Sequence, residues 1–148
     1  MIARRTVLEV VLQSTALACL GGSGLACAYG KSAASGPVQA GNVRAVPVGH
    51  FAFVAGAPIV LARDDKGLYA FSAICPHWGC NMVNDGKVTA EGLTCDCHGS
   101  RFDKLGHVLE GPASDPLVHY KVDLAANGEI VVDAGTKVGD DVRTPVPG

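Results

Sequence analysis

Two short segments limit what this chain can fold into more than any other feature of its sequence. They are residues 75–80, CPHWGC, and residues 95–100, CDCHGS, with 14 residues between them. Each segment holds two cysteines and one histidine, so four of the six cysteines of the chain lie here. Thiolate and imidazole groups are ligands that soft and borderline metals prefer. The two segments therefore predict one metal site built from two loops.

The composition indicates a small all-β domain. A chain of 148 residues is long enough for one domain and a targeting segment. Its 19 glycines, 8 prolines and few aromatic residues favour short strands joined by turns over a helical bundle. A formal net charge of -2, without clustered lysine and arginine, argues against nucleic acid as a partner.

The N-terminal segment is predicted to direct export. Paired arginines at residues 4–5 precede an uncharged run at residues 10–30, and residues 26–28 have the small-x-small pattern of a cleavage site. The segment resembles a twin-arginine export signal, although Val7 and Glu9 depart from that pattern. Such export carries proteins already folded around their cofactors, which suits a metal-loaded domain. A retained membrane anchor is the alternative, because a run of this length just spans a bilayer.

The order of turn-forming and apolar residues divides the chain into segments. Residues 64–67, DDKG, predict a hairpin directly ahead of the first cysteine segment. Strands are expected at residues 43–48, 58–62, 68–71, 93–94, 101–103, 107–109, 117–124 and 129–133. We expect a twin-arginine-type signal peptide or signal anchor at 1–28, a linker at 29–41, the metal-binding domain at 42–135 and a flexible tail at 136–148.

Two kinds of metal centre fit the cysteines and histidines. Zinc accepts two cysteines and two histidines in a tetrahedral site. In a Rieske centre, one iron of a [2Fe-2S] cluster takes two cysteines and the other takes two histidines. The pairs Cys75/His77 and Cys95/His98 would give each iron one ligand from each loop. A zinc-stabilised, non-redox binding module is the remote alternative. A zinc site with these four ligands would give no reason for the second pair of cysteines, Cys80 and Cys97.

The two cysteine segments resemble the paired loops of high-potential Rieske proteins. Residues 111–113, GPA, are similar to the proline loop that covers the cluster in that family. The resemblance extends over about residues 45–133. It implies one Rieske-type [2Fe-2S] cluster per chain, and an all-β Rieske fold of three stacked antiparallel sheets with a cluster-binding subdomain.

The resemblance also implies a role for each residue of the two loops. A disulfide between the loops would need an oxidising compartment, which an export signal supplies. The roles implied are Cys75 and Cys95 on the inner iron, His77 and His98 on the outer iron, Cys80 and Cys97 as a disulfide, and Ser100 as a hydrogen-bond donor to a bridging sulfide.

Five other side chains bear on the predicted site. Phe102 stands where quinol-oxidising members of the family commonly have tyrosine, whose hydroxyl donates to a cysteine sulfur, so we expect a lower potential here. Trp78 either packs within its loop or contacts a partner. The remaining histidines have no partner at ligand spacing and are expected to be ordinary surface or strand residues: His50, His107 and His119.

The predicted function is one-electron transfer on the periplasmic side of the cytoplasmic membrane. The chain would serve as an electron-transfer subunit of an exported or membrane oxidoreductase. Three settings remain open: the Rieske subunit of a cytochrome bc-type quinol oxidase, the small subunit of a molybdenum enzyme resembling arsenite oxidase, and a free periplasmic carrier. The partners expected are a cytochrome c, a cytochrome b or a molybdopterin subunit, and quinol would meet the exposed histidine, His98.

Overall fold

The computed structural model describes residues 33–147. The segments predicted as an export signal and as the first part of the linker lie outside these residues. Within the described range, no helix is long and apolar enough to cross a membrane.

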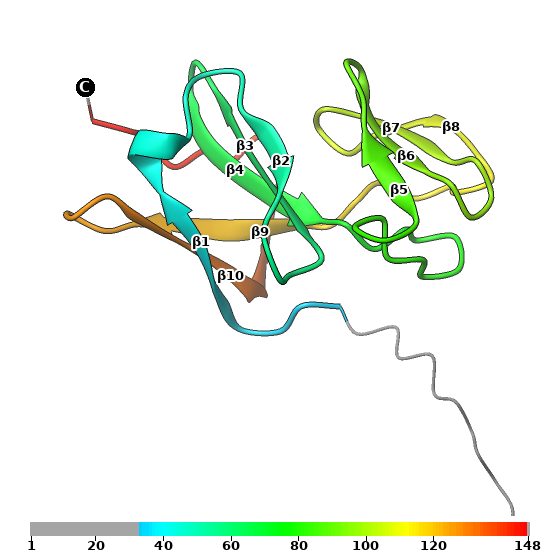
Figure 1. Ribbon diagram of the computed structural model, residues 1–148, viewed down its shortest axis with the longest axis horizontal. Coiled ribbons are helices and arrows are strands. Elements are labelled where there is room, and N and C mark those ends of the chain that lie inside the picture. Colours follow the sequence, from blue (N-terminus) through cyan, green and yellow to red (C-terminus); the bar gives the residue numbers. More distant parts are fainter. Residues whose placement is uncertain (1–32, 148) are drawn as a thin grey trace, which may run out of the picture.

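The described chain folds into two antiparallel sheets, which confirms the all-β prediction (Figure 1). The larger sheet has six strands in the order β1-β10-β9-β4-β3-β2, and the smaller has four in the order β5-β6-β7-β8. The larger sheet contains β1 (Pro37–Asn42), β2 (Phe51–Phe53), β3 (Ile59–Asp64), β4 (Gly67–Ser72), β9 (His119–Leu124) and β10 (Glu129–Val138). The smaller contains β5 (Gly86–Val88), β6 (Gly92–Cys95), β7 (Arg101–Asp103) and β8 (Val108–Glu110).

The larger sheet consists of two halves that share one apolar core. Strand β4 pairs with β9 at only two positions, and this short ladder joins β1-β10-β9 to β4-β3-β2. Ile59 and Leu61 of β3 belong to the same buried cluster as Ile130 and Val132 of β10. The resemblance implied three separate sheets, and this differs from the structure because the β4–β9 ladder makes two of them continuous.

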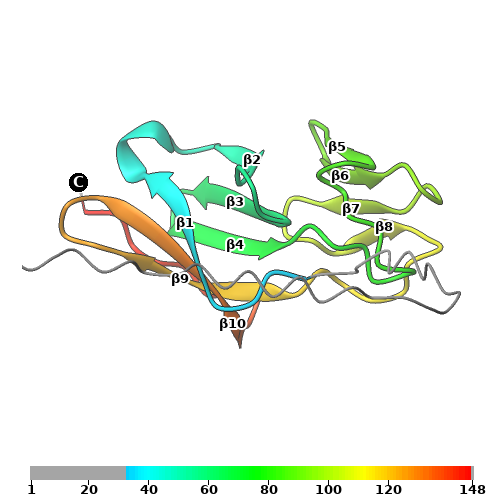
Figure 2. The same ribbon diagram turned by 60° about the horizontal axis from the view of Figure 1, so that its bottom comes forward.

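The smaller sheet lies at one end of the molecule, beside the β3–β4 hairpin (Figures 1 and 2). A second buried cluster connects the two sheets. Val60 and Phe71 from the hairpin pack there with Leu93 of β6 and Phe102 of β7. Every residue of β4 is buried, because its two faces serve two different cores. The second core also contains Cys75 and Cys95, so the predicted metal site rests directly on it.

The start of the domain differs from the prediction. Residues 37–41, expected to be linker, form strand β1 together with Asn42, and this strand pairs with β10. The strand expected at residues 43–48 begins with the 3₁₀ helix Val43–Ala45 instead. Asn42 caps this helix, since its side-chain oxygen accepts a hydrogen bond from the Arg44 amide at 3.1 Å. The strand propensity of a short segment cannot distinguish a linker from an edge strand, because the pairing partner of this strand lies about 90 residues away.

The predicted flexible tail is also fastened to the larger sheet. Strand β10 continues to Val138, and Thr144 exchanges two backbone hydrogen bonds of 2.9 Å with Leu68. Arg143 donates from Nε to Asp64 Oδ2 at 2.6 Å, and its guanidinium lies 4.0 Å from the centre of the Tyr69 ring. The composition of the tail gave no sign of these contacts, because they depend on residues some 75 positions earlier.

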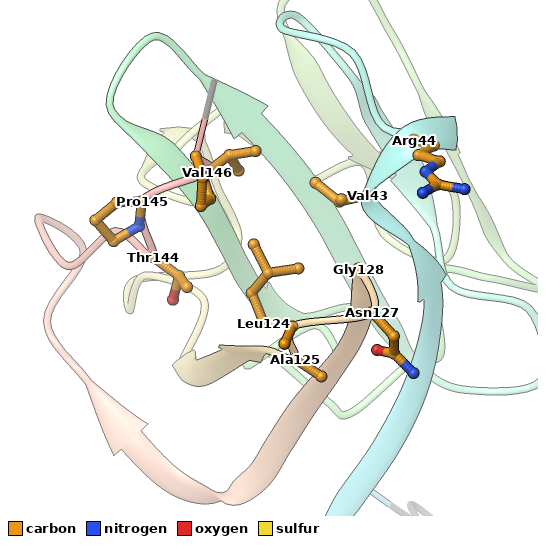
Figure 3. A pocket seen from close by; sticks show the side chains of 11 residues that line it. Val43, Arg44, Leu124, Ala125, Asn127, Gly128, Thr144, Pro145 and Val146 are labelled. Carbon is orange, nitrogen blue, oxygen red and sulfur yellow. The ribbon is translucent and has the colours of Figure 1, made fainter.

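A surface pocket opens at the end of the larger sheet that lies away from the smaller sheet (Figure 1), and Figure 3 shows the side chains that line it. Its volume is about 400 Å³, and its walls come from the 3₁₀ helix, the β9–β10 turn and the tail. Val43, Leu124 and Val146 form much of the apolar lining. None of the cysteines or histidines of the two loops lines it, so it is no part of the metal site.

Candidate metal centre

The two cysteine segments form loops with the same backbone hydrogen bonds. In the first loop, Cys75 N donates to Cys80 O at 2.9 Å, and Gly79 N donates to Cys75 O at 2.8 Å. Gly79 has a positive φ of 73°, which glycine adopts without steric cost. The second loop repeats both bonds, from Cys95 N to Ser100 O at 2.8 Å and from Gly99 N to Cys95 O at 2.9 Å. The two loops are therefore built alike around Cys75 and Cys95.

A disulfide joins the two loops. It connects Cys80 to Cys97 across 17 positions of sequence, as the sequence analysis expected. Cys75 and Cys95 remain free thiols, and both are buried. The Cys95 sulfur lies within 4.8 Å of both disulfide sulfurs. Because oxidised sulfur is no thiolate ligand, these three sulfurs are not themselves a metal site, and the available thiol ligands are Cys75 and Cys95.

The environment of the free thiols suits a metal. Burial raises the pKa of the Cys95 thiol, and the neighbouring Cys75 thiol raises this pKa further. The backbone amides of Cys97 and His98 point at the Cys95 sulfur and favour its thiolate. Two buried thiolates at such close quarters need a compensating positive charge, which bound iron provides.

The rings of the two loop histidines, His77 and His98, lie close together. Their ring centroids are 5.0 Å apart, with the ring planes at 82°. Nδ1 of His77 is buried and has no hydrogen-bond partner within residues 33–147. A buried ring nitrogen without a partner is unfavourable in an ordinary interior but is what a metal ligand requires. The residues present therefore fit a cluster that takes one nitrogen from each imidazole.

Trp78 covers the histidine rings. Its ring stacks on His77 at 5.3 Å with an interplanar angle of 6°, and it meets His98 edge-on at 5.1 Å. The side chain nevertheless remains 65% exposed. The sequence left open whether Trp78 packs in its loop or contacts a partner. The structure shows the packing, because one face of the ring covers a histidine, and much of the remaining ring surface meets solvent.

Ser100 and Phe102 lie directly behind the second loop. Ser100 is fully buried, and its Oγ accepts a hydrogen bond of 3.0 Å from the amide of Ala113 in the proline loop. Since a hydroxyl both accepts and donates, this bond leaves the Ser100 hydrogen free to point elsewhere. Phe102 is buried in the second core and carries no donor.

The remaining histidines have different environments. His119 is buried in β9, where Nε2 lies 2.7 Å from the Leu105 carbonyl oxygen. It is thus an ordinary strand histidine, as expected. His107 is not ordinary, because it lies between Asp103 and Asp140. The i,i+4 spacing of Asp103 and His107 was visible in the sequence, but the contribution of Asp140 was not.

Comparison with known proteins agrees with this geometry. The Rieske [2Fe-2S] domain model matches residues 36–121 of the chain. The chain belongs to the Rieske [2Fe-2S] family. It therefore carries a Rieske [2Fe-2S] cluster. The zinc alternative is not supported by this membership.

Several curated relatives are subunits of electron-transfer complexes. The cytochrome b6-f complex iron-sulfur subunit of Chlorobaculum tepidum is 36% identical over 74 residues, covering 50% of this chain and 39% of that protein. The chloroplastic subunit of Bigelowiella natans is 36% identical over 97 residues, covering 62% of this chain and 36% of that protein. A carotenoid phi-ring synthase of Chlorobaculum tepidum is 34% identical over 106 residues, covering 70% and 16%. The chain thus spans less than half the length of each of these relatives.

Solved Rieske proteins also align with the chain. The plasma membrane Rieske protein of Synechocystis PCC 6803 has 25% identity and a TM-score of 0.43, covering 64% of this chain and 97% of that one. The ferredoxin of carbazole 1,9a-dioxygenase from Nocardioides aromaticivorans IC177 has 28% identity and a TM-score of 0.45, covering 66% and 97%.

Proposed function

We propose that this Rieske protein is a one-electron carrier on the periplasmic side, serving as a subunit of an exported or membrane oxidoreductase. We further propose that its cluster is bound by Cys75 and Cys95 on the inner iron and by His77 and His98 on the outer iron. Two observations carry the ligand assignment: the buried Nδ1 of His77 has no hydrogen-bond partner within residues 33–147, and the same pair of loops holds two buried free thiols.

The bound cluster supplies a site that gains and loses one electron, at a potential raised by its two imidazole ligands. The protein keeps the two loops at a fixed separation, because the Cys80–Cys97 disulfide joins them. Backbone amides directed at the Cys95 sulfur stabilise negative charge there. Ser100 is placed to donate its free hydroxyl hydrogen toward the cluster side, which favours the reduced state.

The two histidine ligands form the side of the site from which a redox partner can approach the cluster. His98 is exposed, whereas His77 is half-buried beneath Trp78. His98 is therefore the ligand whose outer nitrogen we expect to exchange a proton or a hydrogen bond with a donor such as quinol. Trp78 offers a large apolar ring next to both histidines, so we propose it as a contact for a redox partner such as a cytochrome c.

Quinol oxidation is the favoured setting among the alternatives. Two of the relatives above are iron-sulfur subunits of the cytochrome b6-f complex, and this supports membrane association with a cytochrome b partner. Phe102 in place of tyrosine favours a lower potential than such a centre would otherwise have. The settings as a molybdenum-enzyme subunit or a free periplasmic carrier rest on the predicted export signal, which lies outside the described residues.

Electron paramagnetic resonance of the dithionite-reduced protein tests the ligand assignment. We expect the low-field-shifted Rieske signal in the wild-type protein and its loss in His77→Ala. His50→Ala is the matched control, because His50 lies outside both loops, and it should keep the signal. An unchanged signal in His77→Ala would overturn the assignment of that ligand.

The same purified protein tests the wider function. An iron-replete sample without a Rieske signal would contradict the electron-transfer function altogether. If the signal is present, quinol oxidation is tested by reduction of the cluster with a short-chain quinol. Cluster reduction by quinol, slowed in His98→Ala protein that retains iron, supports this setting, and no reduction by quinol contradicts it.

A further inference from the structure

The turn between β7 and β8 is organised around Asp103. Its Oδ1 accepts hydrogen bonds from the amides of Leu105 at 2.8 Å and His107 at 2.9 Å. Its Oδ2 lies 3.2 Å from Nδ1 of His107. Asp103 therefore fixes both the backbone of the turn and one nitrogen of the His107 ring.

A second carboxylate reaches the same ring from a distant part of the chain. Asp140, two residues after the end of β10, places Oδ2 2.6 Å from Nε2 of His107. The carbonyl oxygen of Asp140 accepts a hydrogen bond of 2.7 Å from Arg143, which also binds Asp64. Residues 139–142, named the strap here, are thus tied to the smaller sheet through His107 and to the larger sheet through Arg143.

Both ring nitrogens of His107 face a carboxylate oxygen. An imidazolium has two N–H donors and satisfies both carboxylates, whereas a neutral imidazole has one. Neutral His107 would leave the lone pair of one nitrogen against an anionic oxygen. The contact from the strap to the smaller sheet is therefore complete only while His107 carries a proton.

We propose that His107 and Asp140 form a pH-sensitive latch, which fastens the strap to the cluster-binding subdomain when His107 is protonated and releases the strap when it is neutral. The strap borders a cavity of about 400 Å³ between the two sheets. Its apolar walls include Leu105, Leu117, Val118 and Val138. The cavity is already open to solvent, and release of the strap widens its opening at Asp140.

The charges around His107 set the direction of this switch. The hydrogen bond that His107 donates to Asp140 is the largest influence and raises the pKa of His107, and the charge of Asp103 adds to it. The same bond lowers the pKa of Asp140. From β9 and β10, His119 and Lys137 line the same cavity, and a positive charge on either opposes protonation of His107. The net direction is upward, because the two carboxylates are in direct contact.

The sign of the pH effect follows from this direction. A group with a raised pKa in the folded protein stabilises that state fully below its ordinary value, near 6.5. The stabilisation is lost as pH rises through the raised value. The His107 and Asp140 side chains are 45% and 50% exposed, so solvent screening keeps the effect modest.

The rest of the turn is held by contacts that do not depend on the latch. The Tyr69 hydroxyl donates to Lys104 O at 3.1 Å, and Leu117 N donates to Gly106 O at 2.9 Å. The strap itself has one backbone hydrogen bond, from Val142 N to Gly139 O at 3.3 Å. Release of the latch should therefore detach the strap from the smaller sheet and leave the turn in place, while Arg143 still ties the strap to the larger sheet.

Hydrogen exchange of the cluster-loaded full chain, followed by mass spectrometry and corrected for intrinsic rates, tests the latch. In the wild-type protein, exchange in the strap should accelerate about two- to fivefold between pH 6 and pH 9, the range expected for an exposed ion pair. In Asp140→Asn the strap should exchange at the fast rate at both pH values. Asp141→Asn removes the neighbouring charge, which has no hydrogen-bonded partner in the described chain, and should behave as wild type.

Thermal unfolding gives a second measurement on the same three proteins. The melting temperature of Asp140→Asn should lie below that of the wild type at pH 6, and this gap should close by pH 9. A gap that is constant with pH, a wild-type strap with equal corrected exchange at both pH values, or an equal effect of Asp141→Asn would each overturn the latch.

Discussion

The two sheets of this Rieske protein are stabilised in different ways. Strands β3, β4 and β9 of the larger sheet have six residues each and β10 has ten, and their side chains form a continuous apolar core. The smaller sheet has strands of three or four residues. Such short strands bury little surface by themselves, so this region depends on cross-links: a disulfide and, as we propose, four cluster ligands. The smaller sheet and its loops, which hold the cluster, therefore depend more on these cross-links for their stability than the larger sheet does.

Truncation in the larger core should have the largest effect and should act on the whole molecule. Ile130 is fully buried, and Ile130→Ala should lower the free energy of unfolding by about 2–5 kcal/mol, through lost burial and the cavity left behind. The measurement is urea-induced unfolding followed by circular dichroism. Val131→Ala, at the adjacent half-buried position, is the control and should cost clearly less. Equal losses would mean that the core does not lie where the buried cluster places it.

Removal of the disulfide should act on the smaller region alone. The double variant Cys80→Ser, Cys97→Ser should lose about 2–4 kcal/mol, because the unfolded chain regains the freedom of an open loop. The cluster absorbance should then disappear at a lower temperature than the β-sheet circular dichroism signal. Simultaneous loss of both signals would show that the two regions unfold as one unit.

Substitution of Gly67 should reveal how firmly the tail is attached to the larger sheet. Gly67 has a φ of 140°, and a Cβ there would clash with the Thr144 carbonyl oxygen. Gly67→Ala should cost about 1–3 kcal/mol, because backbone strain is added to the broken tail contact. Gly56→Ala also places alanine at positive φ, 75°, but with open space around it, so it should cost less in the same urea titration. If both variants cost the same, the tail is not held at Thr144.

The smallest effect should come from a hydroxyl introduced beside the cluster. Phe102→Tyr adds a donor behind the loops and should raise the midpoint potential by an amount on the order of tens of millivolts, since one hydrogen bond to the reduced state contributes about 1 kcal/mol. Protein-film voltammetry measures this shift. Phe51→Tyr, on the partly buried edge strand β2, is the matched control and should leave the potential unchanged. A potential that fails to rise in Phe102→Tyr would contradict the account of this position.

The cysteine and histidine loops were predictable because their chemistry is local. The spacing within residues 75–80 and 95–100 identifies a metal site and its ligand types without knowledge of the fold. The β3–β4 hairpin was predictable for a similar reason, since Asp64 Oδ1 accepts from the amides of Lys66 and Gly67 within the turn itself. The edge strand β1 and the fastened tail were missed, because their partners lie far away in sequence.

The sequence by itself determined the all-β class and the two-loop metal site, since these depend on composition and on residue types at short and fixed spacing. Its resemblance to Rieske proteins added the [2Fe-2S] cofactor and the pairing of Cys80 with Cys97. Only the tertiary structure decided that the two halves of the larger sheet join through β4 and β9, that Trp78 meets His98 of the other loop, and that Asp140 meets His107. Each of these contacts brings together elements whose order along the chain does not fix their distance in space. These contacts form because burial and hydrogen bonding favour them in the folded molecule, and no local sequence pattern predicts them.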